Sequence, residues 1–351
     1  MYGLPGQSAG SRLLILSAAF VIVVAGIKAA SPIMVPFLLS VFIAIISAPA
    51  MFFLKNKGLP SGLALVLVIV IVLFVLFLVG VLIGNSVDDF TKSLPQYQAR
   101  LQIQLHSVVA LLSRVGIELS ASMLEEYFDP SVIMRLVANA LSGLGGVFTN
   151  GFLILLTVSF MLLEASSFPA KLHKALDDPD SSLGSFDHFL ETVKRYMVIK
   201  TWVSLGTGLI VWLALALIGI DYPLLWGVLA FLLNYVPNIG SIIAAVPAVL
   251  LAIVQLGWGY ALLTAGVYVA VNVIVGNFIE PKFMGRGLGL STLVVFLSLI
   301  FWGWVLGPVG MLLSIPLTMT LKIALDSNHD TRWIAILLDS EEPHLKETKQ
   351  G

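Results

Sequence analysis

Residues 222–255 decide the fold, and they read YPLLWGVLAFLLNYVPNIGSIIAAVPAVLLAIVQ. The stretch carries no charge, yet Pro237, Asn238 and Gly240 interrupt it near its middle. As one helix, its 34 residues would be about 51 Å long, whereas the hydrocarbon core of a bilayer measures ~30 Å. Each half would be about 22 Å long, which is too short to cross alone. The pattern predicts two helices joined at a break.

A second uncharged stretch, 288–321, has the same length and breaks in the same way at Gly307-Pro308-Val309-Gly310. In both stretches the arm after the break holds one proline, Pro247 or Pro316, which indicates an internal repeat. Membrane transporters use broken apolar segments to place backbone polar groups at membrane depth. The two stretches together therefore favour a transporter.

The composition indicates an integral membrane protein. Hydrophobic residues make up 58% of the chain and charged residues 11%, and the mean hydropathy is +1.01; a soluble domain would carry about a quarter charged residues. The net charge of −1 gives no reason to expect a nucleic-acid partner. The chain has no cysteine, and its five histidines show no metal-ligand spacing, so we expect neither a metal nor a cofactor. No nucleophile–base pair or phosphate-binding loop stands out, so we do not expect an enzyme.

The expected fold class is an all-α, polytopic bundle with two re-entrant helical hairpins and a small helical extramembrane region. Charge and hydropathy divide the chain into five parts. They are the first three membrane spans (1–85), the extramembrane helices (86–143), span four with an amphipathic cytoplasmic segment (144–199), a transport core (200–326) with hairpins 222–255 and 288–321, and a polar tail (327–351).

Lysine and arginine decide the topology, because cytoplasmic loops concentrate them. With the N-terminus in the cytoplasm, Lys55 and Lys57 fall inside, as does the basic segment 165–199. If 222–255 enters and returns on one side, Lys282 and Arg286 also fall inside, together with the C-terminus. The charge rule thus favours re-entrant hairpins, whose tips would meet near mid-membrane. Two kinked spanning helices with no site between them are the alternative.

Polar and glycine residues at the two breaks, and along the span between them, are the candidate substrate-binding residues. Asn272, Gly276 and Glu280 follow i, i+4, i+8 and so share one helix face. The full set is Asn234, Pro237, Asn238, Gly240 and Ser241 at the first break; Asn272, Gly276, Asn277 and Glu280 on the span; and Trp302, Gly307, Pro308 and Gly310 at the second break.

Each of these residues also has a structural interpretation. The asparagines are typical interhelical hydrogen-bonding groups, and the tryptophans are typical interfacial anchors. Glu280 lies beside Lys282 at a membrane edge, where an ion-paired carboxylate competes with a proton carrier. Since no lysine or arginine and no group of carboxylates faces the expected cavity, we expect a neutral site that binds a small polar molecule.

Three motifs resemble a known family. They are Asn234-Tyr-Val-Pro-Asn-Ile-Gly240, Gly276-Asn-Phe-Ile-Glu-Pro-Lys-Phe-Met-Gly285 and Gly287-Leu-Gly-Leu-Ser291. They resemble the autoinducer-2 exporter family of bacterial inner-membrane proteins, and residues 291–316 look most like its quorum-sensing signal branch. The resemblance covers about residues 12–326. It implies a homopentamer, two hairpins that move as a unit in elevator fashion, and a small furanose-like polyol as substrate.

The sequence therefore predicts a multi-pass exporter of autoinducer-2 in the bacterial inner membrane, with a role in biofilm formation implied by the resemblance. Sliding of the hairpin bundle against the first three spans would give alternating access. A sodium/proton antiporter that titrates Glu280 is the alternative within the family. A third possibility is an assembly protein whose 86–143 region binds partners, without any transport.

Overall fold

The computed structural model describes residues 9–114, 151–165, 171, 179–237, 239–284, 289–326 and 331–339. All regular structure in this part of the chain is helical, which confirms the all-α class. Six helical segments among these residues are long and apolar enough to cross a membrane. They are Ser31–Asn56, Ser61–Tyr97, Glu191–Ile218, Ile239–Leu256, Trp258–Phe283 and Thr292–Leu312.

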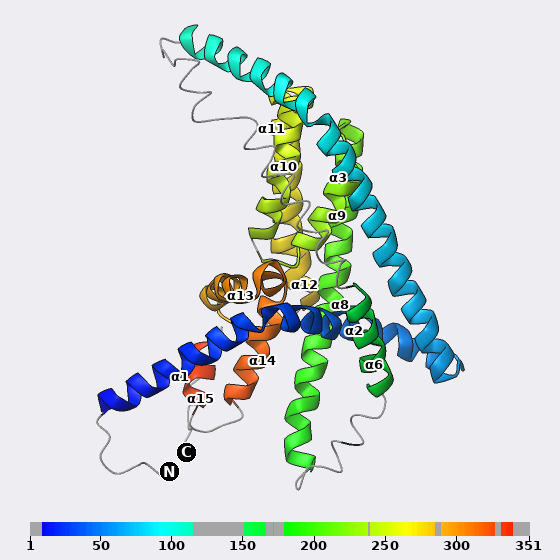
Figure 1. Ribbon diagram of the computed structural model, residues 1–351, viewed down its shortest axis with the longest axis vertical. Helices are drawn as coiled ribbons and strands as arrows, with labels where there is room; N and C mark the ends of the chain where they lie inside the picture. Colours follow the sequence, from blue (N-terminus) through cyan, green and yellow to red (C-terminus); the bar gives the residue numbers. More distant parts are fainter. Residues whose placement is uncertain are drawn as a thin grey trace, which may run out of the picture.

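The first three helices are α1 (Ala9–Ala29), α2 (Ser31–Asn56) and α3 (Ser61–Arg114). They correspond to the first three predicted spans. In Figure 1, α1 and α2 run across the lower half of the molecule, and α3 rises along one side and bends over the top. α3 continues well past residue 85, so the expected boundary at 85/86 lies within this helix. The remainder of the 86–143 region, from residue 115, lies outside the described residues.

The predicted fourth span falls on α6 (Gly151–Glu164), which at 14 residues is shorter than the six segments named above, and the predicted fifth span falls within α8 (Pro179–Ile218). The amphipathic cytoplasmic segment predicted up to residue 199 implies a helix along the membrane surface that turns into the membrane near residue 200. The structure differs, because α8 is one continuous helix of 40 residues. No glycine or proline occurs from Ser185 to Leu205, so nothing interrupts the backbone hydrogen bonds at the expected turn.

The first predicted break is present. Helix α9 (Pro223–Leu233) ends at Asn234, and α10 (Ile239–Leu256) begins after the turn. Gly240 lies so close to α9 that an added Cβ would collide with the carbonyl oxygen of Leu233. Only a glycine leaves room for this contact between the two arms. α11 (Trp258–Ile274), the π-helix η1 (Val275–Ile279) and α12 (Glu280–Met284) follow without a gap.

The second predicted break is present at Gly307, inside α13 (Thr292–Leu312). Gly307 has φ 68° and ψ −152°, a conformation that suits glycine, and Pro308 follows it. The chain continues through α14 (Ser314–Asp326), and α15 (Arg332–Leu337) packs against α14. A Cβ added at Gly310 would collide with the Trp302 carbonyl oxygen, so this turn is as tight as the first. Entry and return of either hairpin on one side of a membrane stays a prediction.

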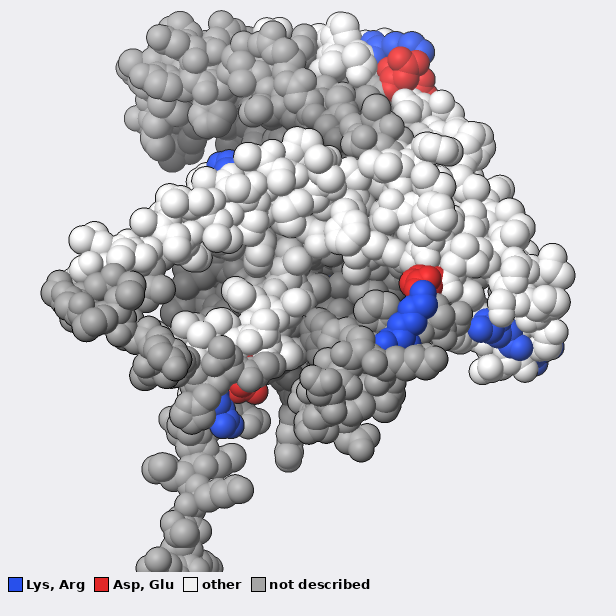
Figure 2. Space-filling model, turned by 60° about the horizontal axis from the view of Figure 1, so that its bottom comes forward, with Lys and Arg blue, Asp and Glu red and all other residues white. Residues whose placement is uncertain are grey.

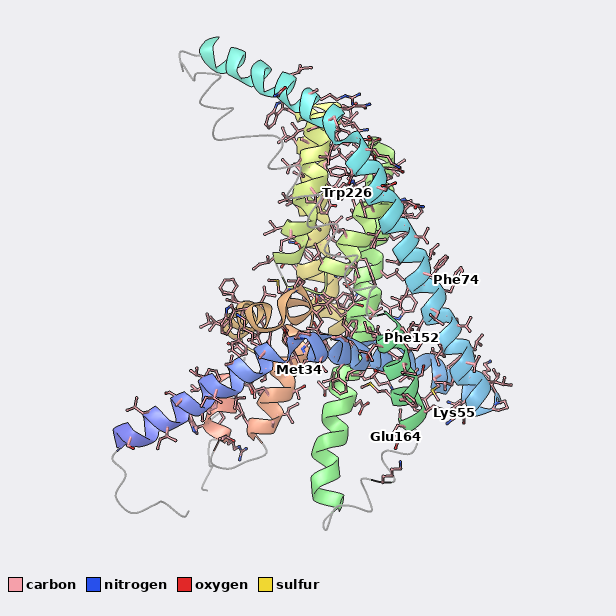
Figure 3. The ribbon with its side chains drawn as sticks, in the orientation of Figure 1. Met34, Lys55, Phe74, Phe152, Glu164 and Trp226 are labelled. Atoms are coloured by element: carbon pink, nitrogen blue, oxygen red, sulfur yellow. The ribbon has the colours of Figure 1, made fainter. Side chains whose placement is uncertain are left out.

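Helices α9 to α11 stand upright beside the upper part of α8, while α1, α2 and α13 cross the lower half of the molecule and the other end of α8 extends below them (Figure 1). The largest buried cluster lies among the upright helices and includes the fully buried Trp226 of α9. The surface is apolar: Phe74 on α3 is 64% exposed and Phe152 on α6 is 80% exposed (Figure 3). Figure 2 shows charged side chains only in small groups, with wide uncharged surface between them. Such a surface suits a hydrocarbon solvent.

We expect Gly240→Ala and Gly310→Ala each to destabilise the protein by about 1–3 kcal/mol, because each methyl group collides with a backbone carbonyl of the opposite arm. Thermal unfolding of purified protein in detergent measures the effect. Gly206→Ala on α8 is the control, since a Cβ there meets nothing within 4 Å. Melting temperatures equal to that control would show that the arms are not packed this closely.

Candidate functional site

A cavity of about 190 Å³ lies beside the first helix break. Its wall comes from α8, the turn between α9 and α10, the start of α10, the α11–η1–α12 segment and α14. Six of the predicted site residues line it, and they come from both the break and the following span. The lining residues are Lys200, Asn234, Val236, Pro237, Ser241, Asn272, Gly276, Glu280 and Ile315.

Polar contacts fix the turn against α8. Asn234, at the C-terminal end of α9, donates its side-chain amide to the Ser204 hydroxyl at 2.9 Å. The hydroxyl of Tyr235 donates to that of Thr201 at 2.8 Å. These bonds hold the non-helical backbone around Pro237 at the cavity, where its polar groups can be reached by a solute.

A π-helix shapes the opposite wall. Asn272, Gly276 and Glu280 all line the cavity, as the i, i+4, i+8 spacing predicts. The π-helix η1 lies between Asn272 and Glu280 along the chain. Single turns of π-helix occur frequently at functional sites. Gly276 has open space where a Cβ would lie, so the backbone is accessible at this point. Asn277 also lies in η1, but it is exposed and does not line the cavity.

An ion pair between Lys200 of α8 and Glu280 of α12 forms the charged part of the cavity. The Lys200 side chain is only 4% exposed and that of Glu280 is 24% exposed. The sequence-based prediction of a cavity without lysine or arginine is therefore wrong, although the pair sums to zero charge. Lys282, the predicted neighbour of Glu280, is exposed and is not the partner.

Lys200 was missed because its partner is 80 positions away in the sequence. It is the last charged residue before the apolar run that ends at Asp221, and the sequence places it at the boundary between the basic segment 165–199 and the predicted transport core. The continuous α8 instead carries it into the protein interior. A buried ammonium group is costly unless it is paired, which is the physical reason why Lys200 and Glu280 meet.

The second break lies outside this cavity. Val305 and Leu306, just before Gly307, pack with Val24 of α1 and against α2. Trp302 donates its indole N–H to Thr318 of α14 at 3.0 Å, so that side chain is used within the second hairpin. The second hairpin instead contributes Ile315 of α14 to the wall of the cavity.

The predicted residues that do not line the cavity fall into three groups. Gly240 is buried where α9 and α10 meet, and Asn238 lies outside the described residues. Asn277 is on the exposed side of η1. Trp302, Gly307, Pro308 and Gly310 belong to the second break, which packs against α1 and α2 rather than facing the first.

The cavity offers amide, hydroxyl, ammonium and carboxylate groups on one side and the apolar Val236 and Ile315 on the other. This combination can donate and accept hydrogen bonds without a net charge, as a small hydroxylated solute requires. Within the described residues, no three His, Asp or Glu side chains group together as metal ligands.

Comparison with known proteins identifies the family to which the chain belongs. The sequence model described as "AI-2E family transporter" matches residues 16–329, and this confirms the resemblance found in the motifs. The chain is 42% identical to the "AI-2 transport protein TqsA" of Escherichia coli K12, over 94% of this chain and 96% of that protein. A "Putative transport protein" of Haemophilus influenzae is 44% identical over 94% and 97%. YhhT of Escherichia coli K12, a "Putative transport protein", is 38% identical over 95% and 96%.

We expect Lys200→Met and Glu280→Gln, made singly, to destabilise the fold by about 3–5 kcal/mol, because each leaves the other charge of the pair buried without its partner. The double variant should recover most of that loss. Thermal unfolding of all four proteins gives the coupling energy. Purely additive losses would show that the two side chains do not interact.

Proposed function

The chain belongs to the AI-2E transporter family, and from that membership we propose that it exports autoinducer-2, a small polar signal molecule. The protein is a multi-pass, all-helical membrane protein of a transporter family. The substrate is suggested by the printed name of the 42% identical Escherichia coli relative, which is an AI-2 transport protein.

One observation supports the position of the solute site: six residues predicted from the sequence line a single cavity at a helix break. In the proposed complex, Asn234, Ser241 and Asn272 bind hydroxyl groups of the solute. Pro237 and Gly276 leave backbone accessible, and Glu280 acts together with Lys200. A broken helix at membrane depth is where secondary transporters bind their solutes, which supports this placement.

The proposed movement is an elevator-type shift of the hairpins α9–α10 and α13–α14 relative to α1–α3, which would open the cavity to alternate sides. The tight turns at Gly240 and Gly310 support it, because they let each hairpin move as a unit. By resemblance, the protein would be a homopentamer in the bacterial cytoplasmic membrane, with both termini in the cytoplasm. No finding supports sodium/proton antiport, and Glu280 is held by Lys200.

The function is tested by flux of labelled autoinducer-2 in proteoliposomes of the purified protein, with and without imposed proton and sodium gradients. We expect saturable flux. Acceleration by one gradient would identify the driving ion, and indifference to both would identify a facilitator. Absence of signal flux together with a sodium-driven pH change would overturn the proposal in favour of the antiporter.

We expect Asn272→Ala to lower the transport efficiency for autoinducer-2 about three- to tenfold, because one neutral hydrogen bond to the solute is lost. Asn277→Ala is the matched comparison. It removes the same amide from an exposed position five residues further along, which does not line the cavity. Initial rates in proteoliposomes, normalised to the amount of folded protein, give the two values. Equal losses would include Asn277 in the site and contradict the position of the cavity.

A further inference from the structure

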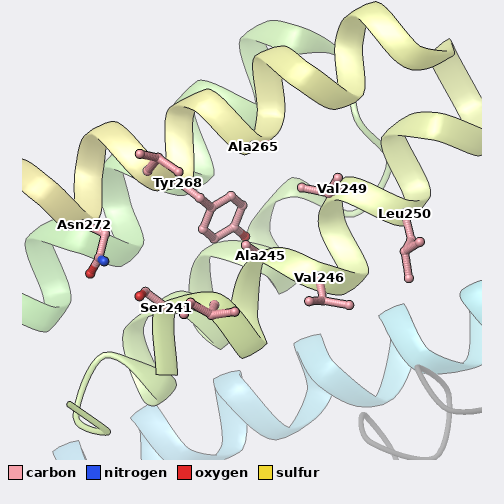
Figure 4. Close-up of a pocket in the computed structure, with 10 residues that line it drawn as sticks. Ser241, Ala245, Val246, Val249, Leu250, Ala265, Tyr268 and Asn272 are labelled. Atoms are coloured by element: carbon pink, nitrogen blue, oxygen red, sulfur yellow. The ribbon is translucent and has the colours of Figure 1, made fainter. Parts of the chain in front are cut away.

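A second, larger cavity of about 340 Å³ lies between α10 and α11, within the size range of small-molecule sites, roughly 300–1,000 Å³. Most of its wall is apolar. Ala245 of α10 and Ala265 of α11 are the small residues that leave the space, and valine and leucine side chains surround them. Figure 4 shows these residues from both helices around the cavity.

The two cavities adjoin. Ser241 and Asn272 line both of them, and Figure 4 shows these two side chains at the same end of the larger cavity. One side of the Ser241–Asn272 pair therefore faces the Lys200–Glu280 ion pair. Its other side faces an almost entirely apolar space. A single molecule that extends from one cavity into the other can therefore place its polar end beside the ion pair and its apolar end in the apolar space.

Tyr268 provides an independent indication of a ligand. Its side chain extends from α11 toward α10 and lines the larger cavity (Figure 4). The residue is 5% exposed, and its buried hydroxyl oxygen has no hydrogen-bond partner in the described structure. Leaving such a group unsatisfied costs about 1–3 kcal/mol, which a ligand oxygen in the cavity would recover.

The depth of Tyr268 argues against a bilayer lipid as the intended occupant. A helix that crosses a bilayer over Trp258–Phe283 would place Tyr268, ten residues and about 15 Å from its end, near mid-membrane. A phospholipid has only hydrocarbon at that depth, and hydrocarbon cannot bond to a hydroxyl group. The occupant must carry an oxygen there, yet fill an apolar space.

We propose that the two cavities form one site for a small amphiphilic solute. Its hydroxyl-bearing end binds beside Asn234, Asn272 and the Lys200–Glu280 pair. Its short apolar end fills the α10–α11 cavity, where Tyr268 donates a hydrogen bond to an ether or carbonyl oxygen. This inference rests on the proposed function in that it takes the polar cavity as the solute site. It narrows the substrate class from polyols in general to polyols and hydroxyketones with an apolar end.

Chain length tests the apolar half. Propane-1,2-diol and hexane-1,2-diol share one polar end and differ by three methylene groups. In ligand-observed NMR titrations of the purified protein in detergent, we expect the longer diol to bind at least about tenfold more tightly. Ala265→Leu fills the cavity and should abolish this gain. Ala270→Leu is the control, because it makes the same change on an exposed position of α11 and should retain the gain.

A second pair tests Tyr268. 3-Propoxypropane-1,2-diol and heptane-1,2-diol have the same shape, but the first has an ether oxygen in place of one methylene. Tyr268→Phe should weaken binding of the ether about three- to tenfold and leave the alkane diol unchanged. Equal effects on both would show that the hydroxyl does not bind the solute.

The outcomes separate this inference from the proposed function. Equal chain-length dependence in the wild type and Ala265→Leu, or no binding of either diol, overturns the inference even if autoinducer-2 flux is measured, and lipid or detergent then occupies the cavity. If Ala265→Leu loses the tighter binding of the longer diol while Ala270→Leu retains it, the inference is supported, whether or not autoinducer-2 is the solute.

Discussion

Backbone hydrogen bonding in hydrocarbon is the constraint on which this structure depends. A bilayer offers no water to an unpaired N–H or C=O group, so a helix can end at membrane depth only where protein covers the break. At both breaks the two arms pack closely against each other, as a break at membrane depth would require. Gly240 contacts the end of α9, and Gly310 contacts the backbone at Trp302. The first break is further held by bonds to Ser204 and Thr201 of α8.

The ion pair adds a second constraint. Lys200 is almost completely buried, and an unpaired charge there would be strongly unfavourable. Glu280 is thereby held close to α8 at the end of the π-turn. Gly276 lies within that turn, and Asn272 lies in α11 just before it. One electrostatic contact between distant parts of the chain thus positions a whole wall of the cavity, and a solute that binds here does so beside charges already neutralised.

Local features were predictable from the sequence, and distant pairings were not. The breaks near Pro237 and at Gly307 follow from proline and glycine in apolar stretches, and the common face of Asn272, Gly276 and Glu280 follows from helical spacing. Charge and hydropathy gave no sign that α8 runs unbroken through residue 200. Sequence neighbours alone pair Glu280 with Lys282, whereas its partner is Lys200 of α8.

The two breaks also show where similar patterns diverge. Both stretches have an apolar arm, a break and a proline in the second arm, yet only the first break lines the cavity. The first carries Asn234 and Ser241, which have hydrogen-bonding groups to offer. Around the second, Val305 and Leu306 are apolar and pack against α1 and α2. A pattern of glycine and proline predicts that a helix breaks, whereas the side chains around it decide which neighbour the break faces.

This asymmetry bears on the proposed movement. α2 meets the first hairpin through an edge-to-face aromatic contact, Phe42 against Tyr235, with ring centroids 5.3 Å apart. The other end of the hairpin differs. Tyr97 of α3 donates its hydroxyl to Asp221, just before α9, at 2.9 Å. A hairpin that slides against all of α1–α3 must break this bond, whereas one that carries the outer part of α3 keeps it. Helix α3 is unusually long, at 54 residues. Its C-terminal part can therefore move with the hairpin while its N-terminal part stays packed beside α2.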